Sequence, residues 1–360
     1  MIQKNLPFAL IMMTLMMSVG LVNHVQIVPL LLETAKRDAW ISILLLIVPF
    51  CLFMIPLYYI CKKTNGLSIQ DWIKHNYGRI ASILFRAIWL VYFIFFVFVA
   101  VKDTVMWTHV SYLPHTPVLV IAFFLCGLSA VVSVFGIRMI LIASGIFLPT
   151  VSLLGFFITF ANLPNKDYSS IFPLLENGWN PIIKALIYVG GEFSELILIT
   201  FLSQHASKKS LWFFILLALM IACIALGPTL GAIAEFGPLE AAKQRYPSFE
   251  EWRLLHIGHF IEHMDYASIY PWITGASIRM SLGICLILDL AKLNQRRTRA
   301  IAASVIGAGF MFANLLPISD YDFLLFLRDW YFPAVLLFHL LVVIGLCGLI
   351  ALLKRKNVTT

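Results

Sequence analysis

Two carboxylates stand at the centre of an otherwise apolar stretch of the chain. Glu192 and Glu195 follow a pair of glycines within the hydrophobic run 182–203. Their i, i+3 spacing puts both side chains on one face of a helix, so they can face one cavity. If that helix crosses a bilayer, an ionised acid there costs on the order of 3 kcal/mol. Such an acid can hold a proton, accept a ligand amine or form a purely structural ion pair; the buried cations available are Arg86, Lys102 and Arg279.

A second group of polar residues follows the spacing His-x-x-Glu-His. His259, Glu262 and His263 match this inverzincin pattern of zinc proteases. A metalloprotease would need a further acidic ligand, for which Asp265 is available, and an open coordination position. Because the segment lies where an apolar run begins, we interpret these residues as polar side chains at the start of a helix. Metal binding is the alternative.

Other catalytic patterns are missing from the sequence. It contains no GxGxxG after a strand, no Walker loop and no GxSxG. The six cysteines lie in or beside apolar runs without a CxxC pair, so we interpret them as small hydrophobic residues. We expect no enzymatic activity, no metal and no cofactor. A polytopic enzyme such as an acyltransferase is the least favoured alternative.

The elements that must position these residues are membrane-spanning helices. Of the 360 residues, 61% are hydrophobic and 12% are charged, whereas soluble domains have about a quarter charged residues. This composition excludes a water-soluble globule and a disordered chain. Continuous apolar runs of span length predict helices rather than strands of a barrel. We expect one polytopic domain, 1–360, with ten spans at about 6–32, 39–61, 81–108, 117–136, 139–161, 182–203, 211–236, 257–289, 299–317 and 332–353.

The basic residues predict how these spans are oriented. Fifteen lysines and arginines lie at the span ends that include Lys4, Lys62 and Arg297, and eight lie at the opposite ends. The two sets alternate along all ten spans, so the positive-inside rule makes both termini cytoplasmic. The net charge of +8 is therefore a topology signal, and we expect the lipid bilayer rather than a nucleic acid as partner.

Spans 1 and 6 are both expected to be interrupted near the membrane midplane. Gly20, Asn23, His24 and Gln26 fall near the middle of the first run, and the glycine pair and two acids fall in the sixth. These spans hold matching positions in two five-helix halves, which are inverted relative to each other because each half has an odd number of helices. Interrupted helices in such positions indicate a ligand site at the midplane; an ordinary helix kink is the alternative.

The longest outer connection, 237–256, is expected to contain a short helix. Ser248 with Glu251 three residues later has the spacing of a capping box. Trp252 in the same segment is typical of the membrane interface.

A family resemblance follows from these same segments. The sequence Tyr246-Pro247-Ser248-Phe249, then Glu262, Asp265 and Trp272, resembles the YPSFE loop and the following acidic motif of the B subunits of bacterial spore germinant receptors. This family is a branch of the amino acid–polyamine–organocation transporter superfamily. His263 stands where the family usually has arginine. The resemblance covers essentially the whole chain.

The two interrupted spans also resemble those of the family. Ser194-Glu195-Leu196, followed by Lys208-Lys209, is similar to its span 6 segment, so Glu195 matches the family glutamate better than Glu192 does. Gly20 and Pro29 remain from its glycine-rich pattern in span 1, whereas the second glycine is absent.

The resemblance implies a LeuT-like fold of 5+5 inverted helices and a role in sensing nutrients, usually amino acids, in the spore inner membrane. It also implies two partners, an A subunit with large soluble domains and a lipoprotein C subunit. A secondary active amino-acid permease is the alternative, because the fold does not decide between sensing and transport.

We expect the nutrient to bind between the broken spans. Near His24, free N–H groups would face a ligand carboxylate, and carbonyls near Val19 and Val189 would face an ammonium. The expected lining residues are Gly20, Val22, Asn23, Tyr92, Phe96, Gly190, Gly191, Glu195, Trp272 and Ser277. Pro29, Glu192, Glu262 and Asp265 are expected to act as family-motif or structural residues.

Overall fold

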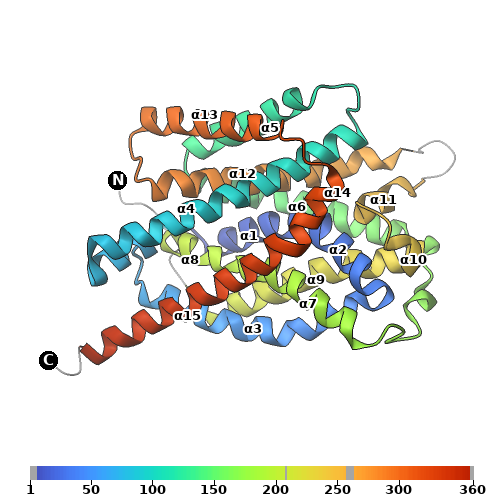
Figure 1. The fold of residues 1–360 in the computed structure, drawn as a ribbon, viewed down its shortest axis with the longest axis horizontal. Coiled ribbons are helices and arrows are strands. Elements are labelled where there is room, and N and C mark those ends of the chain that lie inside the picture. The colour runs from blue at the N-terminus through green and yellow to red at the C-terminus, as the bar shows by residue number, and fades with distance from the viewer. Residues whose placement is uncertain (1–5, 207–208, 257–262, 357–360) are drawn as a thin grey trace.

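The apolar runs form helices because a backbone inside a bilayer must satisfy its hydrogen bonds internally. The computed structural model describes residues 6–206, 209–256 and 263–356. Over these ranges the secondary structure is helical, apart from one isolated bridge between Leu6 and Ala206. The long helices run side by side along the long axis of the molecule (Figure 1).

The helix bounds follow the chain in this order. The first half contains α1 (Phe8–Val22), the π-helical η1 (Asn23–Ile27), α2 (Val28–Ala35), α3 (Ala39–Lys63), α4 (Ile69–Ser111), α5 (Val118–Val134) and α6 (Ile137–Ala161). Next come α7 (Trp179–Ser194), the 3₁₀ segment η5 (Glu195–Leu198), α8 (Ile199–Leu202), α9 (Leu211–Phe236), α10 (Pro238–Ala241) and α11 (Pro247–Arg253). The last elements are the 3₁₀ segment η7 (Met264–Ser268), α12 (Ile269–Leu290), α13 (Arg296–Ala313), α14 (Asp320–Phe326), the π-helical η8 (Leu327–Tyr331) and α15 (Phe332–Lys356).

Seven helical stretches of the described residues are long and apolar enough to cross a membrane. They are Phe8–Lys63, Ile69–Ser111, Ile137–Ala161, Trp179–His205, Leu211–Phe236, Met264–Leu290 and Asp320–Leu353. The first contains two predicted spans, α1 with α2 and then α3. The apolar helix α5 has only 17 residues, and α13 begins with two arginines. The chain is a multi-pass helical membrane protein, and the count of ten spans stays a prediction.

The surface of the bundle supports this conclusion. Val48, Ile80, Leu153 and Ile344 are 65%, 77%, 69% and 67% exposed. Soluble monomers rarely expose contiguous apolar surface on this scale, whereas lipid chains cover it without cost.

The connections between helices gather at two ends of the bundle. The α3–α4 and α12–α13 connections and the end of α15 lie at the left in Figure 1, and α10, α11 and α14 lie at the right. The 237–256 segment is therefore at the opposite end from the end of α15, as the predicted topology requires. Which end faces the cytoplasm stays a prediction.

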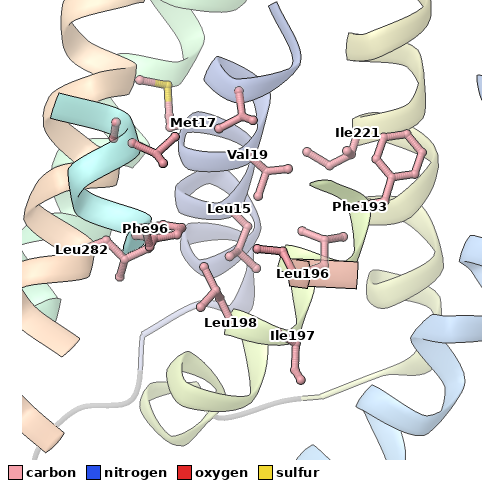
Figure 2. Close-up of a cluster of buried hydrophobic side chains, with 14 of the residues drawn as sticks. Leu15, Met17, Val19, Phe96, Phe193, Leu196, Ile197, Leu198, Ile221 and Leu282 are labelled. Atoms are coloured by element: carbon pink, nitrogen blue, oxygen red, sulfur yellow. The ribbon is translucent and has the colours of Figure 1, made fainter. Parts of the chain in front are cut away.

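Spans 1 and 6 lie in the interior of the bundle. Helix α1 contacts α6, α9, α12 and η5. Figure 2 shows its side chains between those of α4 and α12 on one side and those of α7, η5 and α9 on the other, with Leu15, Phe96 and Leu196 near the centre. Residues of these two spans therefore meet inside the protein, away from lipid.

Both spans change their helix type without unwinding. In span 1 the π-helical η1 occupies Asn23–Ile27, where the polar residues cluster. In span 6 the change to a 3₁₀ helix begins at Glu195, after the glycine pair, which lies inside α7. Since π segments and mid-helix 3₁₀ turns mark functional or strained positions, both places are candidates for a site.

The predicted short helix in the outer connection is confirmed as α11, but its predicted cap is wrong. Pro247 is the first helical residue, and Tyr246 occupies the N-cap position without a side-chain cap. Proline suits that position because its missing N–H has no helical partner there. Ser248 and Glu251 are thus free for contacts with other elements.

Candidate functional site

The polar centre of the bundle is an ion pair between spans 6 and 8. Nη1 of Arg279 in α12 lies 2.6 Å from Oε2 of Glu195, and its Nη2 lies 2.8 Å from Oε1. Both side chains are 0% exposed. This two-pronged geometry is the strongest form of a carboxylate–guanidinium contact. The alternative of an ion pair, left open by the sequence, is therefore realised at Glu195.

Three further elements complete the surroundings of this pair. Nη1 of Arg279 also donates to the backbone carbonyl of Ser18 in α1, at 3.3 Å. The guanidinium carbon lies 3.8 Å from the ring centroid of Phe96 in α4, within cation–π range. The hydroxyl of Tyr331, the last residue of η8, donates to Oε1 of Glu195 at 3.4 Å. Spans 1, 3, 6, 8 and 10 thus meet at one point.

Glu192, one turn before Glu195, has no such partner. Its side chain is buried, and neither carboxyl oxygen has a hydrogen-bond partner within the described ranges. The charges of Glu195 and Arg279 are near enough to act on it. Because an unpaired buried carboxylate costs several kcal/mol, Glu192 is a neutral acid in this arrangement, or the binding partner of a cation that is brought to it.

Tyr92 and a histidine extend the polar centre toward span 10. The ring centroids of Tyr92 and His339 in α15 lie 4.9 Å apart, edge to face. His339 Nδ1 is 2.8 Å from the hydroxyl oxygen of Ser194. The Tyr92 hydroxyl, like Nε2 of His339, is buried and unpaired as far as the structure describes its neighbours. His339 was not predicted, although a lone histidine in the apolar run 332–353 was a visible signal.

The predicted glycines make helix contacts. A Cβ on Gly191 would lie 2.7 Å from the carbonyl oxygen of Phe332, so the glycine lets α7 approach α15 closely. A Cβ on Gly190 would lie 3.3 Å from Leu336, and one on Gly20 would lie 3.5 Å from Ile224. Gly191 therefore has a packing role against the backbone of α15, Gly190 has a tight contact with a side chain, and Gly20 has room for an ordinary Cβ contact.

The other predicted residues are distributed as follows. Val22 and Pro29 are buried in span 1, and Asn23 begins η1. Ser277 in α12 has a buried hydroxyl that is unpaired in the described part of the chain. Trp272 lies seven residues before Arg279, about 10 Å along the helix axis, so it does not reach the Glu195 pair.

Residues of the His-x-x-Glu-His pattern are only partly described. His259 and Glu262 lie outside the described residues, and Asp265 in η7 accepts a hydrogen bond at its backbone carbonyl from the Tyr112 hydroxyl at 2.7 Å. Nδ1 of His263 is 3.9 Å from the Asp265 carboxylate. Within the described ranges, no three His, Cys, Asp or Glu side chains gather at a metal-binding distance.

A second polar centre closes the bundle beneath the outer loop. Arg245 lies 2.6 Å from Oδ1 of Asp103 and 3.1 Å from Oδ1 of Asp320, and it donates to the Val25 carbonyl in η1 at 3.1 Å. Gln26 also donates to Asp103, at 3.3 Å. Burial disfavours the charge, but Asp103 raises the pKa of Arg245 above its ordinary value. Arg245 therefore stays charged and ties the loop to spans 1, 3 and 10.

Aromatic rings surround this second centre. Trp107 and Trp272 stack with centroids 3.9 Å apart and ring planes at 3°. Tyr246 and Phe249 of the loop meet these rings edge to face, at 5.6 Å and 5.7 Å. The Ser248 hydroxyl donates to the His24 carbonyl at 3.4 Å. Trp272 thus belongs to the closure between the loop and span 1.

Comparison with known proteins identifies the kind of membrane protein that carries these centres. A family model described as "Spore germination protein" matches residues 4–321. The chain belongs to the spore germination protein family. It is 39% identical over 327 residues to "Spore germination protein XB" of Bacillus anthracis, covering 91% of this chain and 92% of that protein. It is 23% identical over 278 residues to "Putative spore germination protein YfkT" of Bacillus subtilis (strain 168), covering 76% and 74%.

Membership in the spore germination protein family confirms the resemblance drawn from the loop and span 6 motifs. Glu195, Arg279 and Arg245 lie within the matched residues, whereas Tyr331 and His339 lie beyond them. The bundle thus contains two charged clusters at different depths. Each donates a hydrogen bond to a backbone carbonyl of span 1.

Proposed function

We propose that this chain is the nutrient-sensing subunit of a spore germinant receptor, with a small ligand, an amino acid, bound between spans 1 and 6. The observation that carries the proposal is the buried Glu195–Arg279 pair beside an unpaired Glu192. Charged groups inside a membrane protein mark ligand or ion sites by default because they are costly to bury. Family membership supports the connection to germination.

In the proposed complex, the ligand ammonium binds Glu192. The sequence favoured Glu195 for this role, but Arg279 occupies both oxygens of Glu195. Glu192 offers two free carboxyl oxygens next to that pair. The ammonium of a zwitterionic ligand would neutralise the charge of an ionised Glu192. In the proposed complex, Glu192 therefore releases its proton and binds the ammonium instead.

The proposal includes the LeuT-like 5+5 arrangement with cytoplasmic termini and the A and C partner subunits. Changes of helix type in spans 1 and 6 support the inverted repeat, since these spans hold matching positions. Arg245 and the Trp107–Trp272 stack describe a state closed at the loop end. A ligand shifts the population toward another state only through its differential affinity for the two states, and the partner subunits would respond to that change.

Germination of spores tests the proposal directly. A strain that lacks this chain but keeps its partner subunits is complemented with wild type or with Glu192→Gln, and germination is measured against a panel of amino acids and sugars, alone and in pairs. A lost charge-assisted contact of about 1.5–3 kcal/mol raises the half-maximal amino-acid concentration about 10- to 100-fold. The control is Glu240→Gln, an acid that is 60% exposed in the outer loop.

A hydroxy acid, in which a hydroxyl replaces the ammonium, distinguishes the binding group. Wild type should prefer the amino acid strongly, and Glu192→Gln at normal membrane abundance should lose that preference. A wild-type dose–response for Glu192→Gln would exclude the ammonium role. Unchanged germination in the deletion strain with every nutrient would refute the sensing function itself. Uptake of labelled amino acids by vesicles that hold only this chain would favour the permease instead.

A further inference from the structure

A third charged cluster lies near the loop end of the bundle, outside the proposed ligand site. Nζ of Lys166, in the α6–α7 connection, is 3.2 Å from Oε2 of Glu251 in α11 and 3.7 Å from Oε2 of Glu235 near the end of α9. The three side chains are only 3%, 7% and 0% exposed. The α6–α7 connection, α9 and α11 therefore converge on one buried ammonium.

The backbone around the cluster is shaped to admit it. A Cβ on Gly231 would lie 2.8 Å from Oε1 of Glu251 and 3.1 Å from Nζ of Lys166, so the ends of these two side chains lie directly against the backbone of α9. Nδ2 of Asn162 donates to the backbone carbonyl of Glu251 at 2.7 Å. The N–H of Asp167 donates to the Ala234 carbonyl at 2.8 Å. These bonds fix the positions of α9, α11 and the α6–α7 connection relative to one another.

The charges of the cluster do not balance when both acids are ionised. Two carboxylates against one ammonium leave a net charge of −1 in a buried place. Both oxygens of Glu235 and Oε1 of Glu251 are buried and without a hydrogen-bond partner in the part of the chain that the structure describes. Burial of an unpaired carboxylate is costly, and like charges at close range raise that cost. One bound proton removes both penalties.

Other charged groups on the surrounding elements have partners elsewhere. Arg253 pairs with Glu250 on the exposed side of α11. Asp167 is engaged with the N–H and hydroxyl of Ser169, and Asp265 of η7 faces His263. The nearest titratable group of η1 is His24, whose Nδ1 is 2.8 Å from the Gly20 carbonyl. Lys166 is therefore the cation that the two acids share.

We propose that Lys166, Glu235 and Glu251 form a proton-binding site that controls how firmly α11 is docked onto the bundle. The same loop carries Arg245 and Ser248, which hold the backbone of η1. With the proton bound, the cluster is neutral and α11 stays against α9. Loss of the proton leaves two carboxylates opposed across the α9–α11 contact, which loosens α11 and the cover over span 1.

The direction of the pH dependence follows from the pKa of Glu251 when α11 is docked. Burial raises the pKa of Glu251 from 4.5 to about 7, although Lys166 opposes the rise. A raised pKa in the docked state means that docking is strongest below the ordinary value and weakens as pH rises toward about 7. The docking equilibrium should fall about 300-fold over that interval of about 2.5 pH units, since each pH unit between the two values contributes about tenfold.

Hydrogen–deuterium exchange of the full chain in lipid nanodiscs tests this site. Exchange of residues 247–253 is measured from acid to alkaline pH and corrected for the chemical exchange rate at each pH. Protection should fall as pH rises toward about 7. Glu235→Gln leaves one carboxylate opposite one ammonium, so protection should become independent of pH. The control Glu240→Gln should keep the wild-type transition, because Glu240 is exposed and pairs with Lys243.

A second measurement keeps the test decisive if Glu235→Gln folds poorly. Infrared spectra of wild type should contain a protonated-carboxyl band that disappears over the same pH interval, and Glu251→Gln should remove that transition. Protection that is flat with pH in wild type would overturn the proposal, as would an unchanged transition in a folded Glu235→Gln. A transition that follows sodium or potassium concentration at constant pH would also overturn it, in favour of a metal cation. None of these outcomes depends on nutrient binding, so failure here is separate from failure of the proposed function.

Discussion

Removal of one partner of the Glu195–Arg279 pair should destabilise the protein far more than removal of both. Both side chains are 0% exposed, so Glu195→Gln leaves a buried guanidinium without its carboxylate, next to the Ser18 carbonyl, the Phe96 ring and a neutral amide. Breaking a buried pair in this way costs about 3–5 kcal/mol, whereas apolar residues of similar volume in place of both partners are often neutral. The double variant Glu195→Met, Arg279→Met should therefore recover most of the stability lost by either single variant.

Reversible unfolding in detergent, monitored by loss of helicity, measures these effects. The single variants Glu195→Met and Arg279→Met form a cycle with the double variant, and its coupling energy should be about 3 kcal/mol or more. The control pair is Arg253 and Glu250, at 59% and 31% exposure, where Glu250→Gln should cost less than about 1 kcal/mol. If Glu195→Gln is as mild as Glu250→Gln, or the double variant is no better than the worse single one, the pair does not hold spans 6 and 8 together. Because these variants lower the stability of the protein, their nutrient responses must be normalised to membrane abundance.

The remaining predictions concern topology, helix contact and the loop. In a background free of native cysteines, cysteine at Lys243 should react with an impermeant maleimide from outside and cysteine at Arg297 should not; the reverse pattern would contradict the orientation. Gly191→Leu should abolish the nutrient response and destabilise the protein by about 1–3 kcal/mol because it overpacks the contact with α15, while Gly190→Ala, which meets only a side chain, should be tolerated; equal behaviour of the two would refute the packing role. Arg245→Gln should speed deuterium exchange of the outer loop about 10- to 100-fold, since it removes a charge-assisted contact of about 1.5–3 kcal/mol; unchanged exchange would mean that Arg245 does not hold the loop.

Composition and apolar run length predicted several individual helices because both act locally. The run 211–236 coincides with α9, and the run 39–61 with α3, which ends two residues later at Lys63. Backbone hydrogen bonding leaves an apolar segment in lipid no alternative to a helix, so such bounds can be inferred without tertiary information. The sequence predicted interruptions in spans 1 and 6, whereas the structure has a change of helix type in each, at Asn23–Ile27 and from Glu195, without a break.

The partners of the charged residues could not be predicted from the sequence in the same way. Three cations were available for Glu195, and the structure selects Arg279. Arg86 instead donates to the Leu290 carbonyl, and Lys102 lies 3.5 Å from the Leu316 carbonyl. The selection depends on the rotation and crossing of helices that are far apart in the chain, which local spacing does not encode.

Residues in the π and loop segments were the hardest to predict. Tyr331, which reaches Glu195, is the last residue of the π-helical η8. Glu251 was assigned to a helix cap from its spacing after Ser248, but a proline starts α11 and the acid binds Lys166 instead. In both cases a tertiary contact determines the role of a residue whose local pattern suggests another.

The two charged centres are coupled through the backbone of span 1. Arg279 holds the Ser18 carbonyl before η1, and Arg245 holds the Val25 carbonyl within it. Hydrogen bonds in a π segment run from residue i to i−5 instead of i−4, so conversion to a regular helix rotates the carbonyls that follow. In the proposed mechanism, such a conversion would turn the Val25 carbonyl relative to Ser18 and break its contact with Arg245. One charge-assisted bond contributes about 1.5–3 kcal/mol, which changes a two-state equilibrium about 10- to 100-fold. A ligand proposed to act at Glu192 would then release the outer loop by changing the form of η1.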